Sequence, residues 1–394
     1  MYLLRILTAL ICAHRALALT TGSPYTSSLA QHALQKVLHD ASEIFGLPAP
    51  PSTRTNVSLS TWMSTYPDEA LLTSLTIPGA HDAATWNYSG ARQAALRPVT
   101  DLLNASLSDP RAYRCQRRSV AAALEAGVRF LDLRYAPDAT GTRLVFWHRD
   151  ALLGEAAGVE ELLFAVFAWL RAHASEAVLL SLQYEGATRA GAANSAAVQR
   201  MLFDVLTSPA ARSHLLQTRA LGTLGEARGK AVLVRRFDMD QLPAEYEEAL
   251  PGVHLSPAQW VDNSANITLV YNQSTGATAY IEDLYSPDSV PLSANASSNI
   301  AAKLEAVATH LHEAANGSEE DLFVTFASGQ RLDAEIPVYP ETMALGSGTK
   351  ATPDGGVNQQ LLPTLKELAG RRLGIVVLDF WDEPGALVEA VLGL

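Results

Sequence analysis

Short β-branched and aliphatic runs, each bounded by turn or polar residues, recur along most of the chain. Between most of them the apolar positions take a helical spacing instead. Strands are predicted in eight runs, at 73–77, 128–134, 143–147, 177–183, 231–236, 278–283, 321–326 and 374–379. Helices are predicted at 117–127, 159–173, 297–315 and 356–370. Strands that alternate with helices indicate a parallel sheet covered on both faces.

Two architectures share this alternation, a closed eight-stranded barrel and an open doubly wound sheet, and the strand count alone does not separate them. The expected fold is a single-domain α/β protein, an irregular TIM (β/α)8 barrel. Only residues 135–142 join the second and third runs. This is too short for the usual crossover helix between parallel strands, so irregularity is expected there.

Three segments are predicted along the chain. Residues 1–18 combine Arg5, a mostly apolar stretch and a small-residue Ala16-Leu17-Ala18 pattern, which is typical of a secretory signal peptide. A buried N-terminal helix is the alternative. Residues 19–60 form a leader with a helical pattern at 29–46, expected either to pack on the barrel or to hang free. The barrel domain is expected over 61–394.

Glycosylation sequons support a secreted, extracellular protein. Seven of the eleven asparagines lie in the pattern N-x-S/T with a middle residue other than proline. They are Asn56, Asn87, Asn104, Asn266, Asn272, Asn295 and Asn316. Ordinary serine and threonine usage would give about one or two. This excess predicts a glycoprotein of a eukaryotic secretory pathway.

The net charge limits the classes of partner that the protein can bind, and the cysteine content limits its disulfide bonds. The net charge of −12 disfavours nucleic-acid binding. It also weakens simple attraction to anionic lipid, which normally needs a cluster of lysine and arginine. Because Cys12 lies in the expected signal peptide, Cys115 is the one cysteine of the mature chain. No internal disulfide is expected, and Cys115 is interpreted as a buried thiol, with pairing to another chain as the alternative.

Ionisable residues follow the ends of the predicted strands. His81 and Asp82 come just beyond the first, Arg134 is at the end of the second, and His148 ends the third. Further candidates at strand ends are Asp132, Arg235, Arg236, Glu282, Asp283, Tyr285, Asp379 and Asp382. In a barrel these ends converge on one mouth. Two histidines, acids to orient them and an arginine provide a general base, a general acid and an anion clamp, which indicates phosphodiester chemistry.

Weaker interpretations of the same residues stay open. His81 or His148 alone could be a structural histidine, and Arg134 with Asp132 could form only an ion pair at the mouth. Asp382 could take the role of Asp379.

The blocks IPGAHDA, RFLDLR, VFWH, VLLSLQYE, GKAVLVRRF and VVLDF resemble, in this order, the catalytic domain of the phosphatidylinositol-specific phospholipase C family. The resemblance runs from about Leu75 to the C-terminus and is strongest to the small secreted microbial and fungal type. It implies cleavage of phosphatidylinositol or glycosyl-inositol lipids to diacylglycerol and inositol 1,2-cyclic phosphate. It also implies a monomer with transient peripheral membrane contact and no cofactor.

The resemblance also implies roles for five residues. His81 would take the proton from the inositol 2-hydroxyl, and His148 would protonate the departing glycerol oxygen. Asp82 would orient His148, Asp379 would orient His81, and Arg134 would hold the phosphate. A nucleophile tethered beside the phosphorus gains much of its rate from proximity and needs no metal-activated water. Arg134 also fills the position where calcium-dependent relatives need an anion, so no metal is predicted.

Contacts to the head group match the family less closely. The residues that would bind the inositol ring are Arg236, Asp283 and Tyr285. A lysine that metal-free members carry after the fourth strand is missing here, where Gln183 and Tyr184 stand. Arg189 is the candidate replacement. This departure leaves the head group open.

Two rival functions remain. One is a metal-dependent glycerophosphodiesterase-like barrel, and the other is an inert barrel that binds inositol lipids or glycans without turnover. His310 and His312, two apart on a predicted helix, do not share a face and are expected on a solvated surface. Trp86 and the loop 329–357 are hypothesised to contact a lipid surface.

Overall fold

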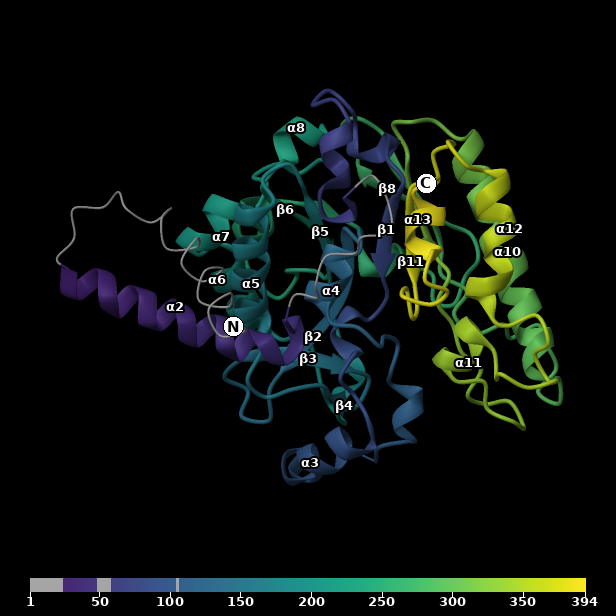
Figure 1. Cartoon of the computed structure of the whole chain (residues 1–394). Coiled ribbons are helices and arrows are strands. Elements are labelled where there is room, and N and C mark those ends of the chain that lie inside the picture. Colours follow the sequence, from purple (N-terminus) through teal and green to yellow (C-terminus); the bar gives the residue numbers. More distant parts are fainter. Residues whose placement is uncertain (1–23, 48–57, 104–105) are drawn as a thin grey trace, which may run out of the picture.

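The computed structural model describes residues 24–47, 58–103 and 106–394 (Figure 1). The expected signal peptide at 1–18 lies outside the described residues, as do the sequons at Asn56 and Asn104.

A nearly closed barrel forms the centre of the described chain. Nine strands follow one another in the order β7-β6-β5-β2-β1-β11-β10-β9-β8. The parallel ones are β1 Ile77–Ala80, β2 Phe130–Pro137, β5 Val178–Tyr184, β6 Ala231–Arg236, β7 Val253–His254, β9 Ala277–Glu282, β10 Leu322–Phe326 and β11 Ile375–Leu378. Strand β8, Ile267–Asn272, pairs antiparallel with β9. The prediction of an irregular α/β barrel is confirmed.

The third predicted run does form a strand, but this strand is not part of the barrel, so the prediction of its place is wrong. Strand β3, Leu144–His148, folds back antiparallel on the end of β2 and continues into β4, Ala151–Leu152. A tight turn makes this possible, because Asp138 Oδ1 accepts a 2.9 Å hydrogen bond from the Thr142 amide. The short connection at 135–142 is therefore a hairpin. The two-residue β7, too short to give a sequence pattern, supplies the remaining parallel strand.

Helices cover the outside of the sheet (Figure 1). The four predicted ones are α4 Val120–Glu125, α5 Val159–Ala172, α10 Ala296–Asn316 and α12 Val357–Glu367. Ser119 and Asn295 cap α4 and α10 by accepting backbone N–H bonds. Helix α2 Pro24–Phe45 covers all but the last residue of the helical pattern predicted at 29–46. The others are α3 Gly90–Thr100, α6 Ala196–Leu206, α7 Pro209–His214, α8 Leu224–Ala227, α9 Ala244–Ala249, α11 Pro340–Leu345 and α13 Leu387–Val391. Short 3₁₀ turns lie at Leu59–Thr65, Leu72–Ser74, Ala83–Thr85, Asp101–Leu103, Pro110–Ala112, Gly186–Thr188 and Pro257–Gln259.

Helix α2 of the leader packs on the barrel by its C-terminal end. Ile44 is fully buried, and its carbonyl accepts a 2.7 Å hydrogen bond from the Trp86 indole. Glu43 pairs with Arg92 and accepts hydrogen bonds from the amides of Ala156 and Ala157. No helix among the described residues is both long and apolar enough to cross a membrane.

A buried ion pair stands at the start of β2 and β5, the end of the barrel opposite the mouth. Arg129 and Glu176 are both fully buried, with 2.7 Å between Nη2 and Oε2. The carbonyls of Leu124 and Ser60 accept the other N–H groups of Arg129. The pair therefore ties β2 to the segment that precedes β1.

Replacing Glu176 by Gln leaves the Arg129 charge buried without its counter-ion. We expect the free energy of unfolding to fall by about 3–5 kcal/mol in urea denaturation. The matched control is Asp40→Asn, which breaks the exposed Lys36–Asp40 pair of α2 and is expected to cost about 0.5 kcal/mol or less. Equal losses in the two variants would contradict this assignment.

Candidate active site

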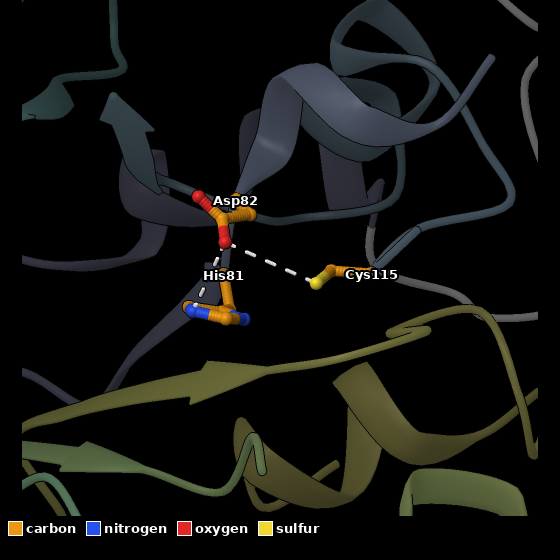
Figure 2. A group of neighbouring side chains, drawn as sticks. All are labelled: His81, Asp82 and Cys115. Atoms are coloured by element: carbon orange, nitrogen blue, oxygen red, sulfur yellow. Dashed lines mark hydrogen bonds and ion pairs between the residues drawn. The ribbon is translucent and has the colours of Figure 1, made fainter. Parts of the chain in front are cut away.

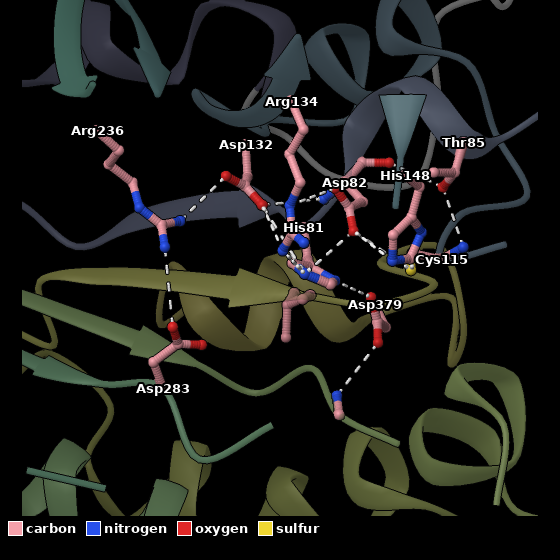
Figure 3. Close-up of polar contacts among 12 residues, drawn as sticks. His81, Asp82, Thr85, Cys115, Asp132, Arg134, His148, Arg236, Asp283 and Asp379 are labelled. Atoms are coloured by element: carbon pink, nitrogen blue, oxygen red, sulfur yellow. Dashed lines mark hydrogen bonds and ion pairs between the residues drawn. The ribbon is translucent and has the colours of Figure 1, made fainter. Parts of the chain in front are cut away.

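The two-residue alternation of the strands brings the polar residues to the mouth. Along β11, Ile375 and Val377 face the apolar interior of the barrel, and Asp379 continues the same phase beyond the strand. His81 follows Ile77 on β1 in this way. Residues Asp132 and Arg134 on β2 and Arg236 on β6 share this phase with their buried apolar neighbours. Figure 3 shows their side chains meeting in one cluster.

His81 is held on both ring nitrogens. Its Nδ1 lies 2.7 Å from Asp379 Oδ1, so this nitrogen carries a proton that it donates to the carboxylate. Its Nε2 lies 3.0 Å from Arg134 Nη2 and must accept there, since Arg has only donors. Gln116 fixes the backbone by donating to the His81 carbonyl at 2.7 Å.

The electrostatic surroundings make His81 a strong base. Burial alone would lower the pKa of His81, but the carboxylates of Asp82 and Asp379 outweigh it and raise the pKa to about 9. This pKa and the contact with Arg134 describe opposite states, since a protonated Nε2 cannot accept from an arginine. The geometry is that of the neutral ring, in which Nδ1 carries the proton and Nε2 carries none. The raised pKa shows how firmly Nε2 would hold a second proton.

His148 reaches the same point from the end of the β3 hairpin. Its Nδ1 lies 2.9 Å from the carbonyl of Tyr113, which requires a proton on Nδ1. Its Nε2 lies 3.4 Å from Asp82 Oδ2. The residue that orients the ring through Nδ1 is therefore Tyr113, by its backbone, while Asp82 faces the nitrogen that is free to exchange a proton.

Asp82 is the shared counter-ion of the cluster. Its Oδ2 is 3.4 Å from Nε2 of both His81 and His148, and its Oδ1 is 2.9 Å from Arg134 Nε. Burial would raise the pKa of Asp82, but Arg134 and the two imidazoles reverse this and lower it to about 2. A permanent carboxylate thus stands between two imidazoles.

A cavity of about 480 Å³ opens above this cluster. On its far side Arg236 lies 3.4 Å from Asp132 Oδ1 and 3.8 Å from Asp283 Oδ2. Trp260 stacks on the Arg236 guanidinium at 3.7 Å and donates its indole N–H to Asp283 at 2.8 Å. Tyr285 also lines the cavity. The predicted ring-binding set therefore lies beside the two histidines.

Several other candidates lie outside the cavity. Two of them are on strands, but their side chains have the opposite phase to the barrel interior. Arg235 points outward to Glu247, and Glu282 points outward to Lys303 on α10. Asp382 pairs at 3.4 Å with Arg118, so Asp379 is the partner of His81. Arg189 lines a separate hollow.

Two sequence expectations outside the site are also corrected. His310 is buried rather than solvated, with Nδ1 2.8 Å from Thr325 Oγ1, and burial lowers its pKa to about 4. Trp86 is half-buried and its indole N–H donates to the Ile44 carbonyl of α2, so this nitrogen is turned toward the protein and not toward a lipid surface as hypothesised.

Four contributors were not foreseen. Arg149, Trp260 and Cys115 line the cavity, and Tyr113 orients His148. Of these four residues, only Arg149 could have been predicted from the sequence, because it directly follows His148. It adds a cation to the cavity wall, which also contains Gln183 and Glu185.

The backbone is left-handed directly after three site residues. Asp82, Arg149 and Phe380 have φ of 39°, 53° and 45°, and they follow His81, His148 and Asp379. Non-glycine residues adopt this conformation at a cost of roughly 1–2 kcal/mol each. Such strain concentrates at functional sites, where it aims side chains.

Comparisons with known proteins agree on the fold. The structure is similar to phosphatidylinositol-specific phospholipase C from Staphylococcus aureus, with a TM-score of 0.63 and 19% identity, covering 85% of this chain and 97% of that one. It is also similar to the enzyme of the same name from Listeria monocytogenes, with a TM-score of 0.57 and 18% identity, covering 85% and 98%. No family model matches the chain. At these identities the likeness shows a shared barrel fold.

Replacing Asp379 by Asn removes one of the carboxylates that raise the pKa of His81. We expect the His81 ring to titrate near pH 9 in the unaltered protein and at a lower pH in Asp379→Asn, measured by NMR of labelled histidine. Asp382→Asn is the matched control and should leave the titration unchanged. An unaltered midpoint in Asp379→Asn would contradict the assignment of the pair.

Proposed function

We propose that the protein is a metal-independent phosphodiesterase that cleaves phosphatidylinositol-type lipids. The observation that carries the proposal is the placement of two Nε2 atoms, each 3.4 Å from one Asp82 oxygen, beside the Arg134 guanidinium. The two imidazoles are thus close enough to act on opposite sides of one phosphorus. The fold shared with bacterial phosphatidylinositol-specific phospholipases supports the same substrate class.

His81 is the base in this proposal. In the neutral form of His81, which predominates above its pKa of about 9, Nδ1–H donates to Asp379 and the free Nε2 accepts the proton of the inositol 2-hydroxyl. The hydroxyl oxygen forms a bond to the adjacent phosphorus, which closes a cyclic phosphate. The new positive charge on His81 is stabilised by Asp82 and Asp379, as the raised pKa indicates.

His148 is the acid. The Tyr113 carbonyl keeps the proton on Nδ1, and Nε2 faces the Asp82 carboxylate. In this proposal a proton on Nε2 passes to the glycerol oxygen as its bond to phosphorus breaks, so diacylglycerol leaves. Arg134 stabilises the charge on the phosphate oxygens with its planar set of donors.

The far wall of the cavity is proposed to bind the inositol. Arg236 donates to ring hydroxyls, Asp283 accepts from them, and Tyr285 lies against the ring. Gln183 and Glu185 line the cavity at the end of β5, where the family lysine is missing, and Arg149 adds a cation to the same cavity, so these three are the candidates for selecting the head group.

Exposed apolar side chains on the loops around the mouth are proposed to touch the bilayer. Val261, Leu292 and Ile336 are 58%, 47% and 79% exposed and lie on the loops after β7, β9 and β10. A 2.9 Å hydrogen bond from the Glu335 amide to the Leu292 carbonyl joins two of these loops. Of the two lipid contacts hypothesised from the sequence, the loop 329–357, which carries Ile336, stays in the proposal and Trp86 does not.

Secretion is proposed on the sequons. Asn266, Asn295 and Asn316 are exposed on the structure and accessible to glycans. Asn87 is half-buried and its amide donates to the Glu43 carbonyl at 2.7 Å, so it is a poorer acceptor.

Two single variants test the chemistry. His81→Ala and His148→Ala should each lower the rate by about 10²–10⁴ while leaving the unfolding transition in place. The assay is phosphorus NMR of cyclic phosphate formed from phosphatidylinositol in the presence of a chelator. His39→Ala, on the exposed face of α2, is the control. An unaltered protein that leaves the lipid intact would favour the inert binding barrel, and loss of activity with chelator would favour a metal-dependent enzyme.

The lipid contact has a separate test. Replacing Val261, Leu292 and Ile336 together by Ser should weaken vesicle binding at least roughly tenfold, since burying each apolar side chain contributes about 1.5–3 kcal/mol. Cleavage of a soluble inositol phosphodiester should be unchanged. The control is Leu47→Ser, which alters a side chain that is 79% exposed on the leader. Equal vesicle binding by both variants would remove the loops from the proposal.

A further inference from the structure

We propose that Cys115, His81 and Asp82 form a binding site for a thiophilic divalent cation such as Zn²⁺ or Cd²⁺, and that this cation inhibits the protein. The binding stands on geometry alone, whereas the inhibition rests on the proposed function. Figure 2 shows the three side chains pointing toward one another at the base of the cavity.

The spacing of the ligand atoms suits a tetrahedral ion. Asp82 Oδ2 lies 3.4 Å from His81 Nε2 and 3.9 Å from Cys115 Sγ, and one ligand atom from each residue falls within 4.8 Å of the others. Ligands that bind one zinc ion at about 2.0–2.3 Å are roughly 3.3–3.8 Å apart. To reach these spacings, the ligand atoms would have to approach one another by between a few tenths of an ångström and about 1 Å.

His148 lies beside the three ligands but outside the group whose atoms fall within 4.8 Å of one another, and it would join as a fourth ligand after a shift of its ring. His148 Nε2 is also 3.4 Å from Asp82 Oδ2, and its Nδ1 is 4.0 Å from the Cys115 sulfur. Because the Tyr113 carbonyl holds the proton on Nδ1, the lone pair of neutral His148 is on Nε2, which faces this point. The full set would be two imidazoles, one carboxylate and one thiolate.

The cysteine is held rigidly at the site. Its amide donates to Thr85 Oγ1 at 3.0 Å, and Thr85 donates that hydroxyl to the Asp82 carbonyl at 2.8 Å. Its own carbonyl accepts from the Phe380 amide at 2.8 Å. Cys115 is thereby tied both to the turn that carries Asp82 and to the residue after Asp379. The backbone of Cys115 is thus fixed, and small shifts of the three side chains would complete the site.

The local charge allows a cation. Carboxylates outnumber guanidiniums five to two in the linked cluster, which contains Asp82, Asp132, Glu185, Asp283, Asp379, Arg134 and Arg236. Arg134 would give up its contact with His81 Nε2 but could keep Asp82 Oδ1, because the metal would use Oδ2. Burial raises the pKa of the Cys115 thiol, so binding would release its proton as the sulfur–metal bond forms.

The ligand chemistry also sets selectivity. A thiolate with imidazoles favours Zn²⁺ and Cd²⁺, whereas Mg²⁺ and Ca²⁺ prefer all-oxygen ligands. Occupancy would tie up the Nε2 atom of His81, which the proposed reaction needs free. Inhibition is therefore expected to compete with substrate.

The test compares cysteine variants of the full chain. Cys12 is the only other cysteine, so Cys12→Ser isolates Cys115. Titration with Cd²⁺ should give the ultraviolet thiolate–cadmium absorption in Cys12→Ser and not in Cys12→Ser/Cys115→Ser. Zn²⁺ should inhibit Cys12→Ser, and adding Cys115→Ser should raise the half-inhibitory concentration at least roughly tenfold, with each rate measured relative to the metal-free rate of the same variant.

Binding and activity are scored separately. A cadmium band in a protein that cleaves no inositol lipid would support the site and overturn the proposed function. Equal inhibition with and without Cys115, or no band in Cys12→Ser, would overturn the site. If the double variant unfolds, histidine NMR of Cys12→Ser decides, because Zn²⁺ should shift the His81 and His148 ring signals together and Mg²⁺ should shift neither.

Discussion

The two-residue period of the barrel strands is the constraint on which the site depends. Every second residue of a strand points into the barrel. Along the strand these residues are apolar, and at the mouth they are polar, as Val377 of β11 and Asp379 just after it show. The other phase turns outward against the helices, which is why Arg236 faces the cavity and its neighbour Arg235 does not. A shift of one residue in a strand would exchange the two sets. Packing of the apolar interior thus fixes the direction of the charged side chains.

Burying several charges at the mouth requires that they neutralise one another. Asp82 meets this need by facing Arg134 with one oxygen and both imidazoles with the other. The left-handed backbone after the site residues indicates strain at the same end of the barrel. The opposite end carries the buried Arg129–Glu176 pair, which binds neighbouring segments together. Reactivity and stability are therefore placed at opposite ends of the strands, as in other barrels of this kind.

The shared carboxylate links the two proposals. An oxygen placed between two imidazoles keeps both rings pointed at one small volume, which suits a phosphodiester that must lose and gain protons on opposite sides. The same convergence of nitrogen and oxygen becomes a metal site when a sulfur stands close, and Cys115 is close. The proposed metal-free reaction and the proposed metal site both rest on this single arrangement. The cation would act by removing the lone pairs on which proton transfer depends.

The sequence by itself determined the α/β class, the main helices, most of the strands, and the placement of His81, Arg134 and Asp379 at strand ends. These follow from periodicity and near neighbours, which are local properties of the chain. Only the tertiary structure decided that the run ending at His148 is a hairpin beside the barrel, and that a two-residue strand takes its place. It also decided that Cys115 joins the cavity wall. Pairing register and loop conformation arise from contacts between segments far apart in the chain, and no local pattern encodes them.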